Sequence, residues 1–76
     1  MFVEHSQVVL SRSLPRLGLE PGDVGVVVHV HGGGQAYEVE FMTFDGHTIG
    51  VETLASADLR QVSAGAVPHE RERAAA

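Results

Sequence analysis

The chain has 76 residues with no cysteine, and its ten carboxylates against five arginines give a formal net charge of −5. This length allows one domain with a small core, and the missing cysteines exclude a disulfide framework or a cysteine-based zinc site. An acidic surface repels phosphate groups, which argues against nucleic-acid and anionic-membrane partners and favours a basic protein partner.

The first third of the chain predicts one short strand and a long loop. Residues 7–11 predict a short strand, whereas residues 12–20 contain glycine and proline breaks and no clean period. We expect that loop to be tucked onto the core by Leu14, Leu17 and Leu19. Pro21-Gly22 then predicts a type II turn.

Residues 23–31 are the strongest strand signal, because four valines recur at every second position. The alternation predicts that Val24, Val26, Val28 and Val30 face inward. It places the intervening residues outward: Gly25, Val27, His29 and His31. A glycine-rich turn follows at residues 32–35, and residues 36–43 form the next strand with Tyr37, Val39 and Phe41 inward. This register pairs Val30 with Tyr37, Val28 with Val39, Val26 with Phe41, and His29 with Glu38 on the outer face.

Asp45-Gly46 predicts the next hairpin. A two-residue turn would place Val39 opposite Glu52, and burying that carboxylate without a partner costs several kcal/mol. We therefore expect a three-residue loop with a bulge, which pairs Phe41 with Ile49 and Val39 with Val51.

The remaining elements complete an all-β fold. Residues 47–53 predict a strand, residues 56–59 a single tight helical turn, and residues 59–62 a short last strand. This order is that of a small five-stranded antiparallel barrel of the Src-homology-3 type, with a short helical turn before the last strand. The barrel domain spans residues 1–62, and residues 63–76 are expected to be a flexible or weakly helical tail.

The sequence also resembles a known family. The pattern includes VVL, LPRLGLEPGDVGVVV, YEVEF, a DG turn and TL followed by DLR, and it runs from Gln7 to Val62. It is similar to a small bacterial family of about sixty residues that is known only as a domain of unknown function. Related barrels occur in a small protein of photosystem I and in nitrile hydratase, where the barrel belongs to the β chain. The resemblance implies an accessory or interaction protein, including an antitoxin-like partner of a toxin-like protein, and it supplies no catalytic residues.

His29 and His31 are the pattern that invites chemistry, because side chains two apart on a strand point the same way. With Glu38 as a third ligand they would form a metal site. The alternative is two solvent-facing histidines with a His29–Glu38 cross-strand pair, and this alternative is favoured. Gly33 and its neighbours join two strands without a helix or lysine, so they predict a hairpin tip and not a phosphate loop.

The outer face predicts a partner-binding surface. Glu38, Glu40 and Glu52 form an acidic stripe that either is simply solvated or docks a basic partner. Val27 and Met42 lie on the same side, with Phe44 in the next loop. The candidate partner-binding residues are Val27, His29, His31, Gly33, Glu38, Glu40 and Met42.

No nucleophile elbow or enclosed cleft is indicated, so we expect a non-catalytic protein without a cofactor. Nothing resembles a secretory signal or membrane span, and the missing cysteines fit the cytoplasm. The expected partner is another protein, with homodimerisation left open. A nucleic-acid-binding barrel is the alternative that the net charge disfavours.

Overall fold

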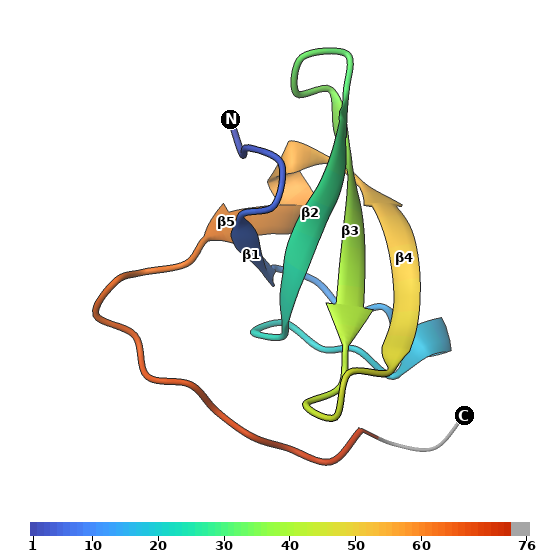
Figure 1. The fold of residues 1–76 in the computed structure, drawn as a ribbon, viewed down its shortest axis with the longest axis vertical. Coiled ribbons are helices and arrows are strands. Elements are labelled where there is room, and N and C mark those ends of the chain that lie inside the picture. The colour runs from blue at the N-terminus through green and yellow to red at the C-terminus, as the bar shows by residue number, and fades with distance from the viewer. Residues whose placement is uncertain (74–76) are drawn as a thin grey trace.

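The computed structural model describes residues 1–73, which form one antiparallel sheet and two single 3-10 turns (Figure 1). The strands are β1 (Gln7–Leu10), β2 (Val24–His31), β3 (Ala36–Met42), β4 (Thr48–Leu54) and β5 (Leu59–Gln61), and the 3-10 turns are η1 (Pro15–Leu17) and η2 (Ser56–Asp58). The strand order is β4-β3-β2-β1-β5. The predicted five-stranded all-β class, with a short helical turn before the last strand, is confirmed. In the described part of the chain β4 and β5 are not paired, so the sheet is curved but not closed.

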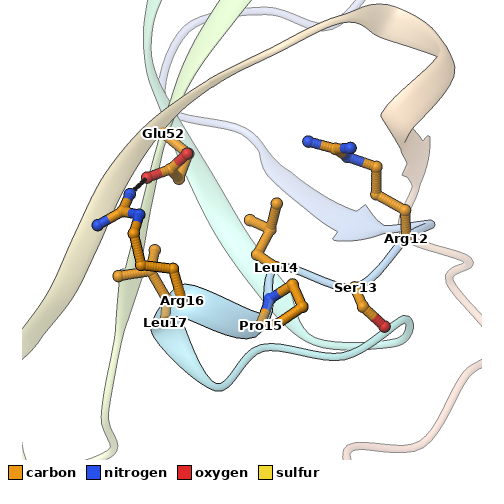
Figure 2. A pocket seen from close by; sticks show the side chains of 7 residues that line it. All are labelled: Arg12, Ser13, Leu14, Pro15, Arg16, Leu17 and Glu52. Carbon is orange, nitrogen blue, oxygen red and sulfur yellow. Dashed lines mark hydrogen bonds and ion pairs between the residues drawn. The ribbon is translucent and has the colours of Figure 1, made fainter. Parts of the chain in front are cut away.

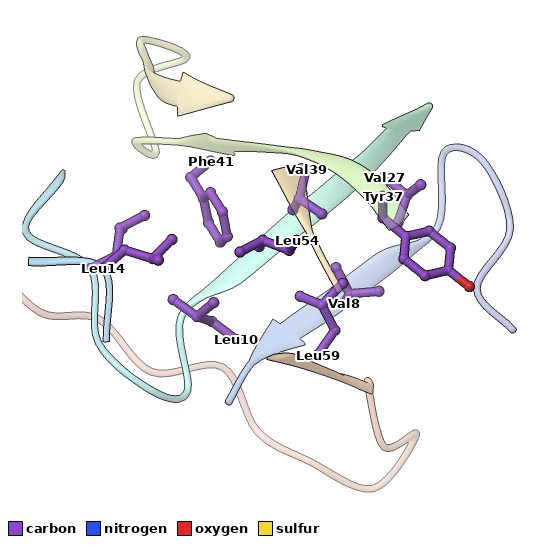
Figure 3. Close-up of a cluster of buried hydrophobic side chains, with 10 residues drawn as sticks. Val8, Leu10, Leu14, Val27, Tyr37, Val39, Phe41, Leu54 and Leu59 are labelled. Atoms are coloured by element: carbon purple, nitrogen blue, oxygen red, sulfur yellow. The ribbon is translucent and has the colours of Figure 1, made fainter. Parts of the chain in front are cut away.

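The core lies on the concave side of this sheet (Figure 3). Tyr37 and Phe41 are its largest fully buried side chains, and Phe2 packs edge-on against the Tyr37 ring. The Tyr37 hydroxyl accepts a hydrogen bond of 3.2 Å from the Phe2 N–H. Within residues 1–73 no buried side-chain nitrogen or oxygen lacks a hydrogen-bond partner. The buried cluster is completed by Val8, Leu10, Leu14, Leu19, Val27, Val39, Leu54 and Leu59.

The predicted facing of β2 is wrong over its first half. Val30 pairs with Tyr37 and His29 with Glu38 as expected, but a bulge between Val27 and His29 shifts the register. Val27 therefore pairs with Val39 and is fully buried. An extra residue in one strand reverses the alternation on one side of it, so the valines before the bulge change faces. Val24 and Val26 lie on the outer side.

The predicted three-residue loop at residues 44–46 is confirmed, because Thr43 bonds to His47 across it and Gly46 has φ = 90°, but the predicted pairs further along β3 and β4 are wrong. Phe41 pairs with Gly50, and Val39 pairs with Glu52, with an irregularity between Phe41 and Met42. Glu52 lies on the core side after all, but at the edge strand, where its carboxylate pairs with Arg16 of η1. The cost that argued against this register applies only to an unpaired carboxylate, and a residue 36 positions away supplies the partner.

The long loop between β1 and β2 folds back as predicted. Leu14 and Leu19 are buried and bridge to each other, with Leu17 half-buried between them. Gly22 has φ = 100°, which fits the expected turn after Pro21. After β5, residues 62–73 contain no helix or strand. No helix of residues 1–73 has the length and apolar character needed to cross a membrane.

Candidate functional site

The outer side of the sheet carries two continuous rows of side chains across its strands. One row runs Gln7, Val26, Glu40, Val51, and the next includes His29, Glu38, Thr53. Val24 lies two residues from Val26 on β2, and Met42 lies two residues from Glu40 on β3, so both point to the same face as the first row. We call the set Val24, Val26, Met42, Val51, Glu38 and Glu40 the outer-face patch. Its apolar side chains come from β2, β3 and β4, and its two carboxylates both come from β3.

The two carboxylates of this patch are held in place by threonines on β4. The Thr53 hydroxyl donates to Glu38 Oε2 at 2.7 Å, and the Thr48 hydroxyl donates to Glu40 Oε2 at 2.7 Å. The hydrogen bond from Thr53, and then the one from His31, lower the pKa of Glu38 below its ordinary value. Glu38 therefore stays ionised to a lower pH than an isolated glutamate, and hydrogen bonds from Thr53 and His31 hold its side chain.

The two histidines lie on the outer face as predicted. His31 Nε2 is 2.7 Å from Glu38 Oε2, whereas His29 Nδ1 is 3.8 Å from Glu4 Oε2. Their rings meet edge to face, with centroids 4.6 Å apart. The cross-strand neighbour of Glu38 is His29, but the hydrogen bond comes from His31, which lies diagonally across the strands.

His29, His31 and Glu38, the ligands of the disfavoured metal alternative, do not form a metal-holding group. In the part of the chain that the structure describes, no group of three or more His, Cys, Asp or Glu side chains is arranged to hold a metal ion. His31 and Glu38 instead form a pair that is completed by the Thr53 hydroxyl.

The aliphatic members of the outer-face patch are unusually open to solvent. Val24, Met42 and Val51 are 46, 47 and 49% exposed, although all three belong to strands of the sheet. Phe44, which follows β3 in the hairpin loop, is 90% exposed. Single exposed apolar residues carry little meaning, but several on one sheet face next to ordered carboxylates resemble an interface.

Not all predicted partner-binding residues belong to this surface. The prediction that Val27 faces outward is wrong, because the β2 bulge turns its side chain into the core, where it is 0% exposed. Gly33 is exposed at the hairpin tip between β2 and β3, beyond the end of the patch. Sequence reasoning placed Val24, Val26 and Val51 inward and so missed them, because their facing depends on the strand register.

A small hollow lies at the edge of β4, on the other side of the sheet (Figure 2). Its volume is about 160 Å³, and most of its lining comes from residues 12–17 of the long loop. Arg16 pairs with Glu52, and the two side chains lie together on one side of the hollow in Figure 2. This ion pair joins the loop to β4. It brings together two opposite charges that lie far apart in the sequence.

A second set of polar contacts was not predicted. Arg71, in the segment expected to be a flexible or weakly helical tail, contacts the carboxylates of Asp23 and Glu20. No local pattern around Arg71 predicts this contact, because its partners are about fifty residues away in the sequence.

The chain matches one protein family. Residues 4–61 match the family described as Domain of unknown function (DUF4926), which covers most of the chain. The chain therefore belongs to this family. No curated protein and no solved structure matches it significantly. The matched region ends at the last residue of β5, so the segment that carries Arg71 lies outside it.

Proposed function

We propose that this chain is a non-catalytic protein-interaction or accessory module that binds a larger, basic protein through the outer-face patch. The observation that carries the proposal is the exposure of Val24, Met42 and Val51 on one sheet face beside two ordered carboxylates. Burying exposed aliphatic area supplies affinity, and complementary charge supplies orientation and a fast, salt-sensitive association.

The acidic composition supports a basic partner. The net charge of −5 attracts positively charged surfaces over a distance of about one Debye length, roughly 8 Å at physiological salt. Glu38 and Glu40 are held by threonines, so little side-chain freedom is lost when a lysine or arginine approaches them. An antitoxin-like protein that neutralises a basic toxin, or an accessory protein that steadies an enzyme, would use this kind of surface.

The hollows of the surface also favour binding over catalysis. The one lined by Arg16 and Glu52 is about 160 Å³, smaller than the roughly 300–1,000 Å³ of most small-molecule sites. A second, of about 350 Å³, is lined by Phe2, Gln7, Gln61 and other side chains that carry neither an acid nor a base. General acid–base chemistry needs such groups within reach of a substrate.

The proposal includes a fold of the Src-homology-3 barrel type in a cytoplasmic, bacterial protein. The strand order, the long loop after β1 and the 3-10 turn before β5 support this fold type. Small barrels of this type present their strands and loops to other proteins, which agrees with an accessory role.

A tagged pull-down from the native cell, at low and high salt, tests the proposal. The matched variants are Met42→Lys in the outer-face patch and Val67→Lys in the segment after β5, where Val67 is exposed to 85%. We expect one stoichiometric partner that is lost at high salt and with Met42→Lys, but retained with Val67→Lys. Equal recovery with both variants, or no specific partner at low salt, would contradict the proposal.

A further inference from the structure

The segment after β5 folds back to the opposite end of the sheet. In Figure 1 it leaves β5 as an extended chain and runs past the lower end of the strands, near the loop that leads into β2. Within residues 62–73, the hydrogen bonds that reach the rest of the chain come from two arginines. Arg71 binds the Gly18–Asp23 loop, and Arg73 donates to the Leu17 carbonyl at 3.2 Å.

Arg71 is bound by three groups of that loop. Its Nε donates to Asp23 Oδ1 at 3.0 Å, and its Nη2 also pairs with Asp23 Oδ2, so the fork engages both carboxylate oxygens. Nη2 donates to the Gly18 carbonyl at 3.1 Å, and Nη1 lies 3.5 Å from Glu20 Oε2. The side chain retains only 25% exposure. This two-pronged contact with a carboxylate selects arginine over lysine, whose ammonium is a single point charge.

Four hydrogen bonds that do not involve Arg71 shape the loop. The Glu20 N–H donates to Asp23 Oδ2 at 2.8 Å, and the Asp23 N–H donates to the Glu20 carbonyl at 3.1 Å. Two further backbone bonds tie the loop to β1: Gly22 N–H to the Leu10 carbonyl and Leu10 N–H to the Asp23 carbonyl, both at 2.8 Å. The Asp23 carboxylate is therefore already oriented when a guanidinium reaches it.

The site and its occupant belong to different parts of the chain. Gly18, Glu20 and Asp23 lie within the family domain, residues 4–61, whereas Arg71 lies beyond its end. The connecting residues 63–70 are exposed throughout and have no strand or helix to hold them. The domain thus carries a formed guanidinium site that an appended segment fills.

We propose that the Gly18–Asp23 loop is a binding site for an arginine side chain of a protein partner, and that Arg71 occupies it in the free protein as an internal competitor. This inference rests on the proposed function, because it names arginine as the basic group that the partner presents. A partner arginine displaces Arg71 and makes the same contacts with Asp23, Glu20 and the Gly18 carbonyl.

The competition has a predictable size. A short flexible connection holds Arg71 near its site at an effective concentration on the order of millimolar. A partner arginine can bind only to molecules from which Arg71 has left the loop. The apparent affinity of the partner is therefore its intrinsic affinity multiplied by the fraction of such molecules. Because surface ion pairs are individually weak and this one is two-pronged, we expect removal of Arg71 to strengthen arginine binding about threefold to tenfold.

The test uses the full chain and a synthetic peptide with the sequence of residues 66–73 as the probe. The peptide is titrated into the wild type and into Arg71→Ala, and the amide NMR signals of residues 18–23 are followed. We expect these signals to shift on making Arg71→Ala, and to return toward their wild-type positions as the peptide binds. The peptide should bind the variant about threefold to tenfold more tightly than the wild type.

Two controls locate the binding. Asp23→Asn in the Arg71→Ala background keeps an oxygen for the Glu20 N–H but removes the charge, so the chain should fold and fail to bind. A peptide with lysine in place of both arginines should bind more weakly. Unchanged signals in Arg71→Ala, or binding that survives Asp23→Asn, would overturn the inference. A dimer of the wild type that Asp23→Asn abolishes would also overturn it, since a second copy would then be the occupant.

The two proposals fail separately. Asp23-dependent peptide binding without any cellular partner would leave the arginine site standing and remove the proposed function. A cellular partner that is lost with Met42→Lys but recovered equally with the wild type and Arg71→Ala would support the proposed function and overturn the arginine site.

Discussion

Truncating Val27 to alanine tests the bulge in β2, on which the identity of the outer face depends. Val27 is 0% exposed and pairs with Val39 in the core, while its neighbour Val28 is only half-buried and sits within the register shift. An uninterrupted strand would reverse these roles and place Val28 opposite Val39. The two valines therefore form a matched pair that differs in nothing but position.

The expected loss follows from the atoms removed. Valine to alanine deletes two methyl groups, each contributing about 0.8 kcal/mol when buried, and the partly unfilled cavity adds to this. We expect Val27→Ala to lower the free energy of unfolding by about 2–3 kcal/mol, or the melting temperature by about 10–20 °C for a domain of this size. Val28→Ala should cost about 1 kcal/mol or less, in proportion to its partial burial.

Urea unfolding provides the assay, with circular dichroism for the sheet and fluorescence for the core. The chain has one tyrosine and no tryptophan, so the fluorescence reports on Tyr37, which is buried in the same cluster. Equal dependence of the unfolding free energy on urea in all variants would show that the same fold is being compared. If Val28→Ala proves the more costly change, the bulge is wrong and Val24 and Val26 no longer belong to the outer face.

Two other predictions concern the packing and the charge of the same sheet. Gly25→Ala would place a methyl group 2.6 Å from Val39 Cγ1, so we expect a loss of about 1–3 kcal/mol in urea unfolding. Gly65→Ala, which meets no atom within 4 Å, should have almost no effect, and equal losses would refute the stated packing. Thr53→Ala removes the main cause of the lowered pKa of Glu38, so a carbon NMR titration should show that pKa rising toward its ordinary value. A carboxylate whose pKa is lowered in the folded state stabilises the protein above the unfolded pKa, and this stabilisation is lost as the pH falls through the folded pKa. The loss of stability below about pH 4.3 should therefore be shallower in Thr53→Ala. An unchanged titration of Glu38 would contradict the assigned cause.

Much of the outer-face patch followed from the sequence. Tyr37, Val39 and Phe41 alternate with charged residues, so the facing of β3 was correctly predicted, and with it the exposure of Glu38, Glu40 and Met42. A strand whose two faces differ in polarity specifies its own orientation, because a slip by one residue would bury charge. The histidines were placed correctly for the same reason, since they pair across from β3.

The opposite condition explains the failure in β2. Residues 26–28 are three consecutive valines, so apolar side chains fit either face and the local pattern does not reveal a bulge. The decision came from the partner strands, which bring Val27 over Val39 and leave Val24 and Val26 outside. Any residue whose exposure depends on that choice was beyond local reasoning.

The sequence by itself determined the kind of fold: five short strands, the turn at Pro21-Gly22, the 3-10 turn before β5, and an acidic surface without cysteine. The tertiary structure alone decided how Glu52 is tolerated on the core side and what Arg71 does. Both depend on an arginine meeting a carboxylate from a distant part of the chain, Arg16 with Glu52 and Arg71 with Asp23. Alternation and turn chemistry act over a few residues, whereas such ion pairs form only after the fold has brought their partners together.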